Sequence, residues 1–182
     1  PKVTVRVNNT KADFDEVYEK LEEAGYDIEE GYVSPEAIII KGGSSIENNE
    51  LFREGFITVQ DESAMLVAPL LDLEKDDIVL DLCAAPGGKT THIAEILNNE
   101  GEIYSFDIHE NKLSLIEDNI TRLELGSIKV EVMDATKLNS NYVDYANKIL
   151  IDVPCSGIGI IRKKPEIKWN KSRKSIKELV PI

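Results

Sequence analysis

The chain has 182 residues, of which 42% are hydrophobic and 30% are charged, and this is the composition of a folded, water-soluble protein. No apolar run approaches the roughly 20 residues that cross a membrane, and no signal peptide opens the chain, so we expect no membrane spans. The net charge of −13 argues against a general nucleic-acid binder, because a basic surface normally supplies the affinity for phosphate.

Residues 1–50 carry the pattern of a small α+β module. Val3–Val7 alternates apolar and polar residues, as a half-buried strand does, and Phe14–Leu21 has apolar residues at helical spacing. Gly25 is placed to end this helix, and the short apolar stretch Ala37–Ile40 predicts a second strand before a Gly-Gly turn. The pattern alone does not give this module a function.

Residues 51–182 predict a second, larger domain. The stretch 60–71 predicts a helix, and strands then alternate with helices from residue 78 onward. Continuous apolar strands that alternate with helices indicate an α/β domain with a parallel sheet covered on both faces. The predicted strands are Ile78–Leu82, Ile103–Ile108, Val130–Met133 and Ile149–Val153, and the predicted helices are Lys89–Leu97 and Lys112–Leu123.

Each of these four strands ends in, or next to, an aspartate. The four residues are Asp81, Asp107, Asp134 and Asp152. A single aspartate at such a place is often a helix cap, but four in succession favour a shared ligand site. The reason is that ligands of open parallel sheets bind beyond the carboxyl ends of the strands.

Small residues and the pair Gly87-Gly88 follow the first strand, and they let a ligand approach the backbone closely. The turn matches neither a dinucleotide nor a nucleoside-triphosphate fingerprint, and a tight turn without a ligand is the alternative. Asp107 is placed to accept both hydroxyls of a ribose, and Asp134 to meet an adenine amino group, so a nucleoside-bearing cofactor is predicted. Because a strand-end acid also suits a nicotinamide cofactor, an oxidoreductase is one alternative function.

Three stretches of the second domain together resemble one family. Asp81–Thr91 (DLCAAPGGKTT) resembles the first motif, and Asp152–Gly157 (DVPCSG) the fourth motif, of the Sun/Fmu (RsmB-like) ribosomal RNA cytosine-5 methyltransferases. Gly159–Trp169 (GIIRKKPEIKW) resembles the signature that follows in that family. The similarity begins near Arg6 and runs to the last residue.

This resemblance implies a class I methyltransferase with a Rossmann-like parallel sheet, preceded by an RNA-recognition-like module over residues 1–50. It implies S-adenosylmethionine as cofactor, small-subunit ribosomal RNA as partner, and no metal. The cofactor contacts that it implies are Cys83, Ala84, Ala85, Pro86, Gly87, Gly88, Lys89, Asp107, Asp134 and Asp152.

Asp152 and Cys155 are the expected catalytic residues. A thiolate that adds to carbon 6 of cytosine makes carbon 5 nucleophilic, and it must leave once carbon 5 has lost its proton. Asp152 is placed to hydrogen-bond the base. A thiol near a helix start and cations would be reactive, although a buried small hydrophobe is the other interpretation of Cys155. In the family that the chain resembles, a cysteine of a later Thr-Cys-Ser motif attacks and the Pro-Cys-Ser cysteine assists release, so Cys155 is expected to be the helper.

The resemblance also leads us to expect an incomplete domain. The complete class I sheet has more strands than the four predicted here, and the chain holds no Thr-Cys-Ser motif. We therefore expect a C-terminally truncated sheet whose last strand is an exposed apolar edge, in a chain that is inactive alone. The two cysteines, Cys83 and Cys155, lie at predicted buried junctions of strand and loop, which favours reduced thiols in a cytoplasmic protein over a disulfide framework.

A basic segment follows the last predicted strand. Eight basic residues and one acidic residue lie between positions 162 and 177, in a chain that is otherwise strongly acidic. Cations beside a tryptophan suit RNA with stackable bases, whereas a solvated, lysine-rich helix start is the alternative. A non-catalytic RNA-binding module is accordingly another alternative function. The residues expected to bind RNA are Arg162, Lys163, Lys164, Lys168 and Trp169.

Overall fold

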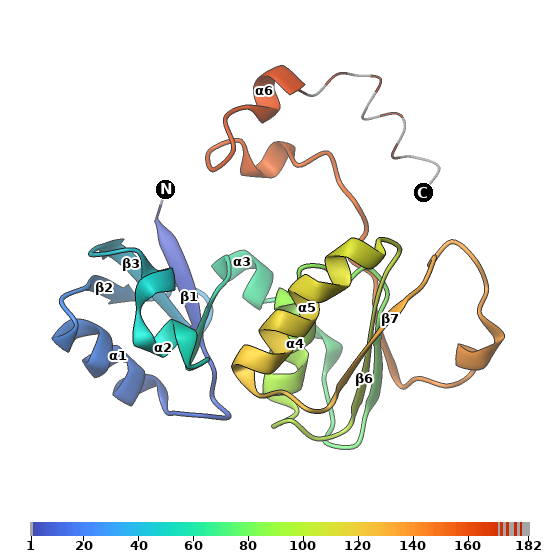
Figure 1. Cartoon of the computed structure of the whole chain (residues 1–182), viewed down its shortest axis with the longest axis horizontal. Coiled ribbons are helices and arrows are strands. Elements are labelled where there is room, and N and C mark those ends of the chain that lie inside the picture. Colours follow the sequence, from blue (N-terminus) through green and yellow to red (C-terminus); the bar gives the residue numbers. More distant parts are fainter. Residues whose placement is uncertain (1, 171, 173, 175–176, 178, 180–182) are drawn as a thin grey trace.

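Two four-stranded sheets lie side by side in the computed structural model, which describes residues 2–170, 172, 174, 177 and 179 (Figure 1). The first sheet belongs to an N-terminal module (residues 2–59), and the second to a parallel-sheet domain that begins near residue 60 and ends at residue 150. Residues 151–170 then form an arm that leaves the second sheet and lies apart from both sheets in this view. Within the described part of the chain, no helix has the length and apolar character needed to cross a membrane.

The first sheet has the order β2-β3-β1-β4, and all its neighbouring strands are antiparallel. One side of α1 packs on this sheet, where Val17 and Leu21 are fully buried. Gly25 follows α1 with a φ of +84°, the left-handed conformation that commonly ends a helix. The strands are β1 (Val3–Val7), β2 (Asp27–Glu30), β3 (Ala37–Gly42) and β4 (Ile57–Val59), and the helices are α1 (Phe14–Glu23) and α2 (Glu50–Arg53).

The predicted strand, helix and strand of this module are confirmed, but the sequence did not reveal β2 and β4. The sequence of β2, Asp-Ile-Glu-Glu, has one apolar residue and shows little of the pattern of a strand. The strand β4 has only three residues. Because β4 pairs with β1, the sheet extends past residue 50, and the division of the chain at that residue stays a prediction.

The second sheet is parallel throughout, in the order β7-β6-β5-β8, which confirms the predicted α/β alternation. The helices α4 and α5 both lie on one face of this sheet (Figure 1), over a core that includes Ile93 and Ile103. On the other face, Phe106 packs against Tyr142 from the connection between β7 and β8. The strands are β5 (Ile78–Asp81), β6 (Glu102–Asp107), β7 (Ile128–Val132) and β8 (Lys148–Leu150), and the helices are α4 (Gly88–Ile96) and α5 (Glu110–Leu123).

Two predicted elements of this domain were wrong in extent. The stretch 60–71 is not one helix, because α3 (Glu62–Met65) ends four residues before Pro69, whose ring would clash with the Met65 carbonyl in a continuous helix. A separate 3₁₀ turn covers Ala68–Leu71. The last strand stops at Leu150 rather than Val153, and it is an edge strand, as predicted, with Ile149 half exposed.

Because β8 ends early, Cys155 lies in the arm. It is exposed there, so the prediction that it is buried was wrong. Cys83 is half-buried, and both thiols are free, as expected. The arm holds a 3₁₀ turn (Ile158–Ile160) and the short helix α6 (Ile167–Asn170). Lys171 and Arg173 of the basic segment lie outside the described residues.

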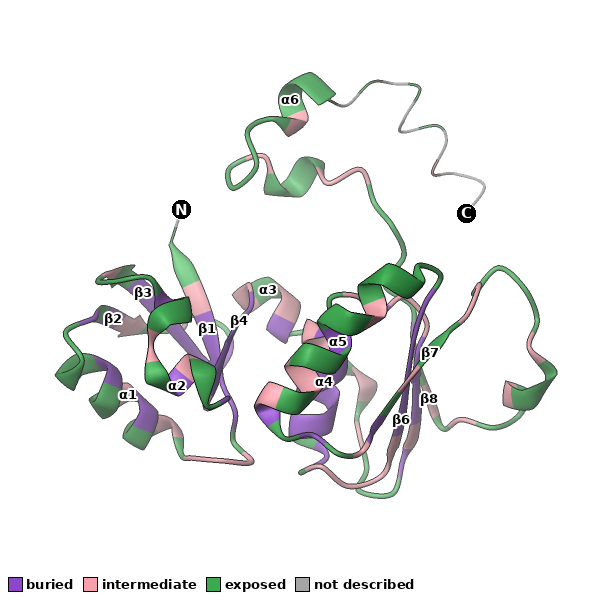
Figure 2. Ribbon diagram, viewed as in Figure 1, coloured by how far each residue is buried: buried purple, intermediate pink, exposed green. Residues whose placement is uncertain are grey.

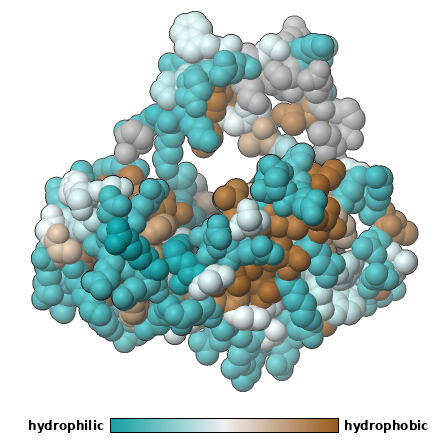
Figure 3. Space-filling view, in the orientation of Figure 1, coloured by the Kyte–Doolittle hydropathy of each residue, from teal (hydrophilic) through white to brown (hydrophobic). Residues whose placement is uncertain are grey.

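Buried residues concentrate in the two sheets and on the helix faces that cover them, whereas the arm is exposed almost throughout (Figure 2). On the face seen in Figure 3, hydrophilic residues dominate the N-terminal module and hydrophobic residues gather beside α4 and α5. Hydrogen bonds join the N-terminal module to the parallel-sheet domain: Arg122 of α5 donates to the carbonyls of Phe52 and Ile57 at 2.7 and 2.9 Å. Gly55, with φ +77°, is needed here, because a Cβ would come within 2.0 Å of the Arg122 carbonyl oxygen.

Candidate functional site

A cavity of about 210 Å³ lies at the carboxyl ends of the parallel strands. Residues that follow each of the four strands line it, and Lys112 from the first turn of α5 completes the wall. Pockets of open parallel sheets that bind ligands form at this edge. The four strand ends therefore meet at a shared cavity, although their aspartates do not all line it.

Asp107, the last residue of β6, is buried and lines this cavity. Its Oδ1 accepts a hydrogen bond from the His109 backbone N–H at 2.9 Å, which fixes the carboxylate at the turn into α5. Within the described residues, no donor is placed on its other oxygen, Oδ2. A fixed carboxylate with one open acceptor suits the hydroxyls of a ribose.

Asp134 also lines the cavity, two residues beyond β7. Its Oδ1 accepts hydrogen bonds from the Thr136 hydroxyl at 2.6 Å and the Thr136 N–H at 3.1 Å, while Lys137 lies 2.9 Å from its Oδ2. The bonds from Thr136 and then Lys137 lower the pKa of Asp134 to about 2. Asp134 therefore shapes its own turn as well as the cavity wall.

Asp81, the last residue of β5, is buried beneath the loop that follows it and does not line the cavity. Its Oδ2 accepts a hydrogen bond from the Thr90 hydroxyl at 2.6 Å, and its Oδ1 accepts one from the Cys83 N–H at 3.4 Å. Burial raises the pKa of Asp81 to about 6. This carboxylate fastens the loop to the start of α4.

The predicted cofactor loop, Cys83 to Lys89, contributes Cys83 to the cavity wall, while its remaining residues lie outside that wall. Burial raises the pKa of the Cys83 thiol. The loop is held by the Ala84 N–H, which donates to the Phe106 carbonyl at 2.8 Å. Gly87 has a φ of +99° and packs on α5, since a Cβ there would lie 3.2 Å from Ile116. The loop is thus a rigid turn between β5 and α4.

Asp152 and Cys155 lie outside the cavity wall as well. Ile151 and Val153 line the cavity and Asp152 between them does not, so the alternation of an extended chain turns Asp152 away. Its Oδ2 lies 2.6 Å from the Lys89 Nζ, which ties the end of β8 to the cofactor loop. The structure does not bring the two predicted catalytic residues together with Asp107 and Asp134 in one pocket.

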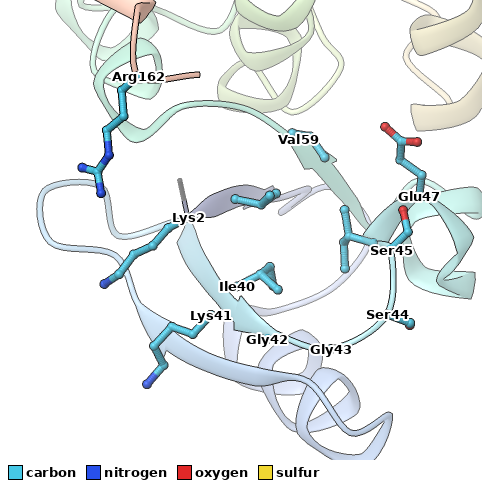
Figure 4. A pocket seen from close by; sticks show the side chains of 12 residues that line it. Lys2, Ile40, Lys41, Gly42, Gly43, Ser44, Ser45, Glu47, Val59 and Arg162 are labelled. Carbon is cyan, nitrogen blue, oxygen red and sulfur yellow. The ribbon is translucent and has the colours of Figure 1, made fainter. Parts of the chain in front are cut away.

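The predicted RNA-binding residues are distributed along the arm. Lys163 is paired with Asp61 of the parallel-sheet domain, and Lys164, Lys168 and Trp169 are exposed, Trp169 to 85%. Arg162 lines a second hollow, of about 660 Å³, together with Lys2 and Lys41 of the N-terminal module (Figure 4). Arg162 and Lys163 therefore face the body of the protein, whereas Trp169 projects into solvent.

Lys112 and Arg6 are charged residues at or behind the site that were not predicted as site residues from the sequence. Lys112 lines the cavity. The sequence feature that could have indicated it is its position in the first turn of the helix that follows Asp107. Arg6 is fully buried behind the cofactor loop, and its hydrogen bonds reach α4. Little in the sequence indicated this role for Arg6, because a charged residue at the polar position of an alternating strand normally faces solvent.

Both parts of the chain match models of known protein families. A family model described as 16S rRNA methyltransferase RsmB/F matches residues 68–182, and one described as the RsmF/B-like ferredoxin-like domain matches residues 1–47. The Bacillus subtilis protein named "Probable ribosomal RNA small subunit methyltransferase B" is 43% identical over 173 residues. That match covers 94% of this chain and 38% of the Bacillus protein.

Solved structures show the same architecture. The crystal structure of PH0851 is 36% identical with a TM-score of 0.92, over 98% of this chain and 40% of that one. A methyltransferase homologue from Pyrococcus horikoshii is 29% identical with a TM-score of 0.78, over 97% of this chain and 55% of that one. The chain thus spans about two fifths of the Bacillus relative and of PH0851.

Proposed function

The chain belongs to the RsmB/F family of 16S rRNA methyltransferases, and from this premise we propose that it is the part of such an enzyme that binds S-adenosylmethionine beside the target RNA. Its parallel-sheet domain has the class I methyltransferase fold, as the sequence predicted. We infer further that the methyl group goes to carbon 5 of a cytosine in the RNA of the small ribosomal subunit.

The observation that carries the cofactor assignment is the cavity at the strand ends. It combines an apolar wall, including Ile151 and Val153, with the fixed Asp107 carboxylate, whose Oδ2 is open. An adenosine group needs both features, since its base is flat and largely apolar while its ribose offers two hydroxyl donors. The residues present therefore fit this cofactor. We propose that Asp107 accepts the ribose hydroxyls and that Asp134, together with Met133, borders the adenine.

When bound, S-adenosylmethionine supplies an electrophilic methyl group. The chain contributes the rigid Cys83–Lys89 turn, held from below by Asp81, and the apolar residues that exclude water from the cavity. Burial disfavours the Cys83 thiolate, so we propose a structural role for Cys83 in the loop.

On the side of the RNA base, we propose that Asp152 accepts a hydrogen bond from the exocyclic amine of cytosine. Lys89 supports this role, because its ion pair holds the Asp152 carboxylate next to the cofactor loop. The exposed Cys155, three residues further on, is proposed to assist release of the methylated base. Neither Cys83 nor Cys155 is assigned the attacking role, so we propose that the chain alone does not turn over.

The RNA itself is proposed to contact the arm. Trp169 offers an exposed ring for stacking, with Lys168 next to it, and Arg162 adds a cation at the hollow shared with Lys2 and Lys41 (Figure 4). Because Lys2 and Lys41 are themselves paired with Glu29, the cations of the arm would supply most of the attraction to phosphate in a chain whose net charge is −13.

Calorimetric titration with S-adenosylmethionine and, in parallel, with NAD tests the cofactor. We expect binding of S-adenosylmethionine and none of NAD, because the turn after β5 lacks the dinucleotide fingerprint. Binding of NAD without binding of S-adenosylmethionine would overturn the proposal in favour of an oxidoreductase.

Incubation with cofactor and RNA that contains 5-fluorocytidine tests the roles of the cysteines, because this base traps an attacking thiolate as a covalent adduct. We expect no adduct with this chain. An adduct that disappears in Cys155→Ala, but persists in the matched variant Cys83→Ala, would show that Cys155 attacks the base and does not merely assist release.

A further inference from the structure

Arg6 of β1 is the most completely bonded cation in the part of the chain that the structure describes. Its side chain is fully buried, and each of the five N–H groups of its guanidinium has an acceptor. The acceptors are Glu95 Oε2 at 2.8 Å and Oε1 at 2.7 Å, the Gly88 carbonyl at 2.9 Å, Thr91 Oγ1 at 3.1 Å, and Gln60 Oε1.

Three of these acceptors follow one another along α4. Gly88 is its first residue, Thr91 lies about one turn on, and Glu95 about one turn further. The guanidinium of Arg6, which belongs to the N-terminal module, therefore binds the first two turns of α4 in the other domain. Gln60, which follows β4, completes the contact, since its Nε2 also lies 3.4 Å from the Gly88 carbonyl.

The start of α4 is also the end of the cofactor loop. Thr90, in the same first turn, binds Asp81 at 2.6 Å, and Asp81 in turn accepts from the N–H of Cys83, which lines the cavity. Arg6 thus lies behind the loop and Asp81 beneath it. Thr90 and Asp81 therefore connect the start of α4 to the cavity wall by hydrogen bonds.

We propose that Arg6 is a positioning residue for the methyl-donor site, through which the N-terminal module sets the geometry of the cofactor loop without touching the cofactor. The inference rests on the proposed function of the cavity. Only arginine serves here, because lysine has three donors on a single nitrogen and cannot span Gly88, Thr91 and Glu95.

The test compares Arg6→Met and Arg6→Lys with the matched variant Arg122→Met. Arg122 also joins the module to the domain, but none of its acceptors lies in α4 or in the cofactor loop: they are the Phe52 and Ile57 carbonyls, the Thr58 hydroxyl and Asn119 Oδ1. Asn119 donates to the Pro86 carbonyl of the loop through its Nδ2, a bond that does not involve the guanidinium. All variants are titrated with S-adenosylmethionine at a temperature where circular dichroism shows them folded. We expect Kd to rise at least tenfold in both Arg6 variants and to stay within twofold in Arg122→Met, while both Arg→Met variants lower the unfolding midpoint.

A readout without cofactor separates this inference from the proposed function. Hydrogen–deuterium exchange of amides 83–91 is expected to accelerate in Arg6→Met and not in Arg122→Met. If wild-type chain does not bind S-adenosylmethionine, the proposed function fails, and the inference fails with it.

If wild type binds but the Arg6 variants bind equally well, or if Arg122→Met changes Kd and loop exchange as much as they do, the positioning role alone is overturned. Should Arg6→Met not fold, Gln60→Leu, which removes one acceptor of the same network, is expected to raise Kd at least threefold, and an unchanged Kd would overturn the inference.

Discussion

Replacing Asp107 by asparagine tests the proposed cofactor site at a single atom. Asparagine has the same size, and its Oδ1 still accepts the hydrogen bond from the His109 N–H, so the turn into α5 is retained. The open Oδ2 becomes an NH₂ group, which turns a charged acceptor into a donor that faces the ribose hydroxyls. A hydrogen bond to a charged group contributes about 1.5–3 kcal/mol, so we expect Kd for S-adenosylmethionine to rise about 10- to 150-fold.

Calorimetric titration measures this change, with the thermal midpoint recorded to show that the fold is kept. Asp134→Asn is the matched control, because both oxygens of Asp134 already have partners in Thr136 and Lys137, and we expect a change in Kd of about fivefold or less. An Asp107→Asn chain that binds within threefold of wild type would refute the argument that Asp107 holds the ribose.

Three further predictions concern stability and RNA. Gly55→Ala should lower the free energy of unfolding by about 2–5 kcal/mol in denaturant titrations, because its Cβ meets the Arg122 carbonyl, whereas Gly25→Ala, with a similar φ but nothing within 4 Å, should cost only about 1–2 kcal/mol. The raised pKa of Asp81, from 3.8 to about 6, means that the folded state holds the proton more tightly, so stability should be highest below pH 4 for this group and be lost as pH rises through 6. Asp81→Asn should remove that slope, and an unchanged slope between pH 4 and 6 would count against it. Trp169→Ala should weaken RNA binding by about 1–3 kcal/mol in filter-binding or fluorescence assays without changing the thermal midpoint or Kd for cofactor, and unchanged RNA affinity would exclude stacking on this ring.

The parallel sheet could be predicted from sequence because short strand patterns alternate with helices along the chain, and because its two central strands, β5 and β6, are almost fully buried. The antiparallel sheet was harder to predict. An acidic strand such as β2 gains its place from pairing with β3, which no local pattern reveals. The stretch 60–71 was wrongly predicted as one helix, because its local apolar spacing is that of a helix although Pro69 prevents a continuous one.

At the candidate site, the sequence predicted which strand ends meet but not which side chains face the cavity. Asp107 and Asp134 line it, whereas Asp81, at the end of β5, and Asp152, just after β8, do not. That outcome depends on the residue at which each strand stops, and a difference of one position reverses the direction of a side chain. β8 was predicted to extend to Val153, and it ends at Leu150.

The contact between module and domain explains why a buried arginine is used where an apolar residue would pack more simply. The two apolar cores are separate clusters, and polar contacts join the module to the domain, among them those of Arg6, of Arg122 and of the His92–Glu36 pair at 2.7 Å. Apolar packing tolerates sliding and rotation, whereas a guanidinium with five acceptors is satisfied in one orientation only. Removing one partner of such a buried pair typically costs about 3–5 kcal/mol, so the orientation is strongly enforced. The N-terminal module, which carries Lys2 and Lys41 of the proposed RNA hollow, is therefore held at a fixed distance from the cofactor loop, as methyl transfer between two bound molecules requires.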